Sequence, residues 1–112
     1  MDIHAIYSGV EIPKMVTKRF NRSSMYFVPY NINEDNGTYT YNYVSLPPEN
    51  YNYGGLVDAI IGTKYSLSNV IAIVINYIGD STNDEYNKEF NELQEWRKFA
   101  KIESRKHFNM EL

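Results

Sequence analysis

The chain contains no cysteine and only two histidines among its 112 residues. The lack of cysteine excludes disulfides, thiolate metal sites and cysteine nucleophiles, and it suits a reducing compartment. The histidines, His4 and His107, lie at opposite ends of the sequence, and no paired-histidine motif occurs. Calcium-loop, phosphate-loop and serine-nucleophile motifs are also missing from the sequence. We therefore expect a protein that is not an enzyme and has no metal site and no cofactor.

Positive charge and long apolar runs are also scarce. The formal net charge is -3, and residues 24–55 contain no lysine or arginine. Nonspecific binding to nucleic acid needs a dominant positive field, so nucleic acid is an unfavourable partner. The longest apolar run, residues 70–75, is far shorter than the ~20 residues that a membrane span needs. With no signal peptide visible, these absences predict a cytoplasmic protein without membrane association.

The sequence does contain enough apolar side chain for one core. Apolar residues make up 43% and aromatic residues 15% of the chain. This length suits a single domain over residues 1–112. We expect a β-rich half over residues 1–46 and a helical half over residues 54–108.

A period-two pattern over residues 24–46 predicts a β-hairpin. Asn36-Gly37 lies between two runs of strand formers, and both residues tolerate positive φ. We expect antiparallel strands near residues 24–32 and 38–46.

Two further features bear on the sheet. Pro29 cannot donate a hydrogen bond to a neighbouring strand, so its strand should lie at an edge or carry a bulge. Apolar residues at alternate positions within residues 3–10 indicate a short N-terminal strand, which would make the sheet three-stranded.

Tyr39, Tyr41 and Tyr43 project to one face of the second hairpin strand, and we call this the tyrosine face. A row of tyrosines can anchor a protein interface or stack on a sugar. The alternative is that these residues are good strand formers that cover a small core. Base stacking is disfavoured because interleaved lysine or arginine is absent.

Four basic side chains between residues 14 and 22 form a second candidate surface, the basic segment: Lys14, Lys18, Arg19 and Arg22. This segment either grips an acidic partner or is a solvated connection, and short charge runs are usually the latter.

Two short helices are expected after Pro47-Pro48. Gly54-Gly55 leads into the first, over residues 56–61. Ser66 or Ser68 caps the second, over residues 69–78, and Gly79 ends it. The second helix is apolar nearly all round, so we expect it to be buried on most sides.

A long third helix is predicted over residues 81–108. Thr82 and Glu85 fit a capping box at its start. Trp96 lies near its middle on an apolar face, and acids crowd its first half and bases its second, which suits the helix dipole. The predicted core consists of Val57, Ile60, Ile61, Val70, Ile73, Val74, Tyr77, Phe90, Leu93 and Trp96.

Six short stretches of the helical half carry a family resemblance. They are Tyr53-Gly54-Gly55-Leu56-Val57-Asp58-Ala59-Ile60-Ile61, Lys64-Tyr65-Ser66, Ala72-Ile73 with Asn76-Tyr77, and Glu89-Phe90-Asn91-Glu92-Leu93-Gln94-Glu95-Trp96-Arg97 with Ala100-Lys101. This pattern resembles small uncharacterised proteins of Bacteroidales phages, prophages and related mobile elements. The resemblance implies a phage-linked origin and a role as a virion component, assembly factor or adaptor. It brings no known reaction and no catalytic residues.

Together these features predict an α+β domain, with a Tyr-rich antiparallel hairpin of two or three strands followed by three helices. The leading hypothesis is a non-enzymatic interaction or structural protein of a phage or mobile element. It would work with protein partners in an assembly or homo-oligomer, in the cytoplasm of the producing cell or in a phage particle. A carbohydrate- or ligand-binding module that uses the tyrosine face is one alternative. A small regulator of a host enzyme is the other.

Overall fold

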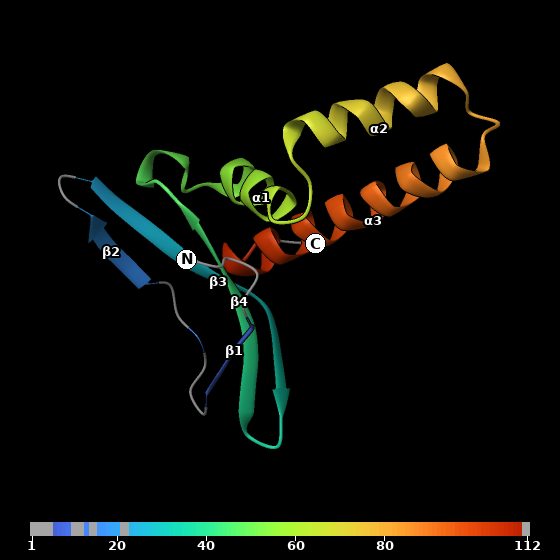
Figure 1. The fold of residues 1–112 in the computed structure, drawn as a ribbon. Coiled ribbons are helices and arrows are strands. Elements are labelled where there is room, and N and C mark those ends of the chain that lie inside the picture. The colour runs from blue at the N-terminus through green and yellow to red at the C-terminus, as the bar shows by residue number, and fades with distance from the viewer. Residues whose placement is uncertain (1–5, 10–12, 14–15, 21–22, 111–112) are drawn as a thin grey trace.

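The computed structural model describes residues 6–9, 13, 16–20 and 23–110. These residues form a four-stranded antiparallel sheet, followed by a short 3-10 turn and three α-helices (Figure 1). The predicted α+β class, with strands first and helices after them, is confirmed.

The four strands are arranged in the order β1-β4-β3-β2. Their bounds are Ile6–Gly9 for β1, Val16–Phe20 for β2, Ser23–Asp35 for β3 and Thr38–Leu46 for β4. The expected hairpin, β3 and β4, forms the centre of the sheet. β1 is the third strand that the sequence indicated, and it pairs with β4. β2 is a fourth strand, and it pairs with β3 in the middle of the segment interpreted as a connection.

The hairpin turn forms at Asn36-Gly37 as predicted. Both residues have positive φ, 52° and 82°, and Asp35 pairs with Thr38 across the two-residue loop. Positive φ at both central residues is the signature of the type I′ turn, whose twist matches that of the flanking strands.

Pro29 is accommodated in one of the two ways that the sequence suggested: β3 is an inner strand of the sheet and not an edge strand, but it carries an irregularity. The pairing of β2 with β3 ends at Phe27, so Pro29 has a described neighbour only in β4, opposite Tyr43. An irregularity in the register follows between Tyr30 and Asn33, where Asn31 has a φ of 56°. The strand that contains Pro29 therefore carries the bulge that the sequence suggested, immediately after the proline.

The helices span Tyr53–Gly62 in α1, Leu67–Gly79 in α2 and Asp84–His107 in α3, after a 3-10 turn at Pro48–Asn50. Ser66 caps α2, as one of the two predicted serines. The predicted capping box of α3 is wrong: Asn83 is the N-cap, and its side chain accepts a hydrogen bond from the Tyr86 N–H. Thr82 instead donates its hydroxyl to the Asp80 carboxylate at 2.7 Å.

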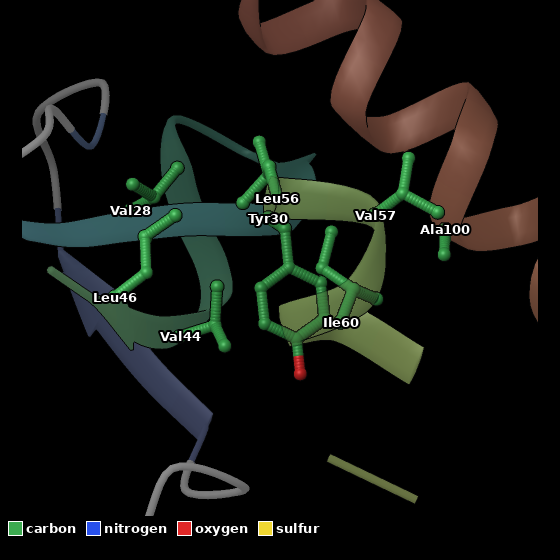
Figure 2. Close-up of a cluster of buried hydrophobic side chains, with 8 residues drawn as sticks. All are labelled: Val28, Tyr30, Val44, Leu46, Leu56, Val57, Ile60 and Ala100. Carbon is green, nitrogen blue, oxygen red and sulfur yellow. The ribbon is translucent and has the colours of Figure 1, made fainter. Parts of the chain in front are cut away.

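The core lies between one face of the sheet and the helices α1 and α3 (Figure 2). It is made of Val28, Tyr30, Val44, Leu46, Leu56, Val57, Ile60 and Ala100. Val57, Ile60 and Leu93 are buried as predicted, and Ile61 and Trp96 pack against the cluster. The hairpin residues were missing from the predicted core because a strand pattern does not reveal which face the helices will cover.

The predicted burial of α2 is wrong, because none of its residues is buried. The helix packs mainly on α3, and together with the first half of α3 it projects from the sheet as a two-helix arm (Figure 1). The radius of gyration of 16.1 Å exceeds the ~13 Å expected for a compact domain of about this length, in keeping with the projecting arm.

Candidate functional site

The most unusual surface of the described chain is the outer side of α2. β-branched residues dominate this helix and would equally suit a strand. Its ends decide in favour of helix. The Ser66 hydroxyl accepts from the Asn69 N–H at 3.1 Å, and the Asp80 N–H closes the last turn on the Asn76 carbonyl at 3.0 Å.

One side of α2 is occupied by α3. The half-buried residues recur at helical spacing and include Val70, Val74 and Tyr77. The Tyr77 ring stacks on Phe90 of α3, with 3.9 Å between ring centroids and 11° between ring planes. This contact fixes which side of α2 faces inward.

The opposite side of α2 is apolar and open to solvent. Leu67 is 76% exposed, Ile71 48%, Ile75 62% and Ile78 75%, and we call these four residues the α2 stripe. Their spacing of four, four and three places them along one side of the helix. Single exposed apolar residues are common, but a contiguous patch of them marks a binding surface.

No charged side chain interrupts this surface. Residues 67–79 contain no Asp, Glu, Lys or Arg, and their polar side chains are those of Ser68, Asn69, Asn76 and Tyr77. A surface without charge can be buried against another apolar surface without the cost of desolvating an ion. The arrangement suits docking to a macromolecule.

The tyrosine face lies on the side of the sheet opposite α1 and α3. Tyr39, Tyr41 and Tyr43 are half-buried, while Val44 and Leu46, which point to the other face, are in the core. The rings of Tyr41 and Tyr43 meet edge to face, at 5.3 Å and 89°. Perpendicular rings fit well against each other, but this pair does not form a flat platform.

The basic segment falls largely outside the described residues. Lys14 and Arg22 lie outside them altogether. Lys18 and Arg19 lie in β2, where they pair with Met25 and Ser24 of β3. Residues 16–20 form a strand at the edge of the described sheet, so their interpretation as a connection is wrong. Charged residues are typical of edge strands because they discourage further strand addition.

A shallow hollow lies where α1, α3 and the hairpin meet. It has a volume of about 520 Å³, and its lining includes Asn42, Thr63 and the stacked rings of Trp96 and Phe99. The Lys64 ammonium lies 5.1 Å from the centroid of the Trp96 ring. The Trp96 indole N–H donates to the Ile60 carbonyl at 3.2 Å, so the indole joins α3 to α1. The Trp96 indole of this hollow thus has a structural role.

The polar cluster at the end of α3 also has structural contacts. The Tyr51 hydroxyl lies 2.7 Å from Nε2 of His107, and burial lowers the pKa of His107 below its ordinary value. Glu103 accepts from the Asn31 N–H at 2.6 Å and pairs with Lys106 at 3.3 Å. The Glu103 carboxylate thereby holds the irregular segment of β3 against α3.

Neither a metal site nor a single spanning helix is present in the part of the chain that the structure describes. No group of three or more His, Cys, Asp or Glu side chains there could hold a metal ion. Within the same residues no helix alone has the length and apolar composition to cross a membrane, although α1 and α2, joined at an 83° bend, have them in combination.

The α2 stripe was missed by sequence reasoning. The signal in the sequence was that a helix with apolar residues on all sides is followed by only one long helix that could pack against it. The bend between α1 and α2 directs α2 away from the sheet, so its second side stays uncovered.

Comparison with protein-family models, with curated proteins and with solved structures found no match to this chain.

Proposed function

We propose that this protein is a non-enzymatic interaction protein that docks a protein partner through the α2 stripe. The observation that carries the proposal is the exposure of four large apolar residues along one side of an uncharged helix. Leaving such a surface in water costs about 25 cal/mol for each Å² that a partner could cover. A protein partner that covers these four side chains would remove that cost.

The projecting arm supports this role. Because α2 packs mainly on α3, its outer side can be covered without displacing the core between α1, α3 and the sheet. The partner meets a preformed helix, so little conformational entropy is lost on docking. The core and the sheet serve as the base that holds the arm.

The resemblance of the helical half to phage and mobile-element proteins supports a place in an assembly, as a virion component, assembly factor or adaptor. We place the protein in the cytoplasm of the producing cell, and in the particle if it is a virion component. The carbohydrate-binding alternative is weaker because the Tyr41 and Tyr43 rings are perpendicular, and a sugar platform needs accessible ring faces.

Affinity capture from producing cells tests the proposal. The double variant Ile71→Ser/Ile75→Ser removes the centre of the stripe, while both side chains are already largely exposed, so the fold should persist. Ile32→Ser is the matched control, because Ile32 is 44% exposed and lies on the sheet. We expect one set of proteins to be captured by the wild type and the control and to be lost with the double variant. Capture of the same set by all three would refute docking through α2.

A further inference from the structure

The shape of the outer side of α2 narrows the choice of partner, given the proposed function. Leu67, Ile71 and Ile75 follow one another at intervals of four and form a ridge. The neighbouring row at the same interval begins with Ser68 and Ala72, which have small side chains and are exposed, and continues with the half-buried Asn76. A ridge of large residues therefore lies beside a groove of small ones on the same helix.

We propose that the occupant of this surface is the α2 of a second copy of this chain, packed antiparallel about a two-fold axis near Ala72. The ridge of each copy then lies in the groove of the other. Ile71 and Ile75 flank the partner's Ala72, and Ser68 faces the partner's Asn76. A two-fold interface needs one self-complementary patch, and the adjoining ridge and groove provide it. Packing of such rows is the commonest way in which helices meet in globular proteins.

Charge also favours a second copy over other occupants. Residues 67–79 carry no charge, so pairing α2 with itself buries no ion and brings no like charges together within the helix pair. A charged partner helix would lose hydration without gaining a counter-charge. The antiparallel orientation also opposes the two helix dipoles favourably.

A lipid surface fits this face less well. Helices that lie in a membrane interface carry Lys and Arg on their polar side. The first half of α3, which lies alongside α2, is instead acidic, with Asp84, Glu85, Glu89 and Glu92 against Lys88. Anionic lipids would repel these carboxylates.

The size of the surface sets the strength of the dimer. A helix of 13 residues is about 20 Å long and about 10 Å wide. One helix pair of this size is smaller than the roughly 800 Å² per partner of a standard interface. We therefore expect a reversible dimer with a dissociation constant of roughly micromolar magnitude or weaker.

Sedimentation velocity over a concentration series of the full chain tests this inference. We expect the wild type and Ile32→Glu to shift from monomer to dimer as concentration rises. Ile75→Glu, which places a carboxylate in the interface, should weaken the dimer by about tenfold or more. Far-UV circular dichroism confirms that each variant is folded. A wild type that stays monomeric to several hundred micromolar, or an Ile75→Glu variant that dimerises normally, would overturn the inference.

Disulfide trapping tests the position of the axis without weakening the interface. The chain has no cysteine, so a single introduced thiol can crosslink only to another copy. Under mild oxidation Ala72→Cys should form a covalent dimer, whereas Asn91→Cys, at an exposed site on α3, should not. Equal crosslinking of the two variants would contradict the two-fold arrangement.

The outcomes separate this inference from the proposed function. A strictly monomeric chain whose partner capture still depends on Ile71 and Ile75 overturns the second-copy inference alone. Stripe-dependent binding to phosphatidylglycerol vesicles, with no dimer, overturns the inference and points to a lipid surface. A stripe variant that changes neither self-association nor capture overturns both.

Discussion

Short polar side chains fix the starts of all three helices. Asn52, Ser66 and Asn83 each stand in extended backbone just before a helix. Each accepts a hydrogen bond from the backbone N–H three residues later. These bonds satisfy donors that a helix N-terminus leaves without partners.

The cap of α3 gives a prediction at this scale. Asn83→Ala should lower the free energy of unfolding by about 1 kcal/mol, because the Tyr86 N–H loses its acceptor. Thr82→Ala is the matched control and should have a smaller effect, since the Thr82 hydroxyl bonds only to the exposed Asp80 carboxylate. Urea denaturation of both variants measures the difference. A larger loss of stability with Thr82→Ala than with Asn83→Ala would indicate that the capping box suggested by the sequence does form.

Among the elements, the entry to α1 is the most tightly constrained. A Cβ at Gly55 would collide with the backbone carbonyl of Asn50. A Cβ at Gly54 would meet only the Asn52 side chain, at an ordinary contact distance of 3.7 Å. Gly55 is thus needed for the close approach of two backbone segments, whereas Gly54 has no such role.

The two adjacent glycines provide a matched pair of variants. Gly55→Ala should destabilise the protein by about 1–3 kcal/mol, because backbone must move to make room. Gly54→Ala should be neutral or stabilising by up to about 1 kcal/mol, because alanine favours helix over glycine. Thermal unfolding of the two variants tests this contrast. Equal effects would mean that the Asn50 carbonyl does not approach Gly55 closely in solution.

α2 was predicted correctly as a helix, but its burial was predicted wrongly. Its N-cap and most of its length follow from nearby residues, so the helix was predictable over residues 69–78. The predicted stop at Gly79 is wrong, because Gly79 is the last helical residue and Asp80 is the C-cap. The apolar pattern of α2 indicated burial on most sides. An apolar pattern shows that burial would be favourable for the helix. Whether the helix is buried depends on which other elements pack against it.

For the whole molecule, the contact between Tyr51 and His107 links the segment after the sheet to the last turn of α3. The ring of Tyr51 also packs on Phe108 and Tyr26. Burial lowers the pKa of His107 below its ordinary value of 6.5, so the folded state favours the neutral imidazole. A proton is then bound more tightly by the unfolded chain than by the folded one.

The sign of this linkage gives the pH dependence. His107 contributes full stability above pH 6.5, and that contribution is lost as pH falls from there through the lowered pKa of the folded state. His107→Gln should therefore lose less stability than the wild type between pH 7.5 and pH 5. Urea midpoints of both proteins at the two pH values measure this difference. Equal losses would show that His107 does not titrate differently in the folded and unfolded states.

The sequence by itself determined the local structure of this protein. The Asn36-Gly37 turn, the start of α2 after Ser66 and the α+β order of elements depend on φ preferences and on hydrogen bonds between near neighbours. Such interactions act over a few residues and are therefore visible in the sequence.

Only the tertiary structure decided which surfaces are covered. Residues 16–20 form an edge strand because they pair with the side of β3 that β4 does not occupy. Val28, Val44 and Leu46 are in the core because α1 and α3 pack on the face of the sheet to which these side chains point. The α2 stripe stayed in solvent because the bend after α1 turns α2 outward. Burial depends on the directions of whole elements, and these are set by packing between residues far apart in the chain.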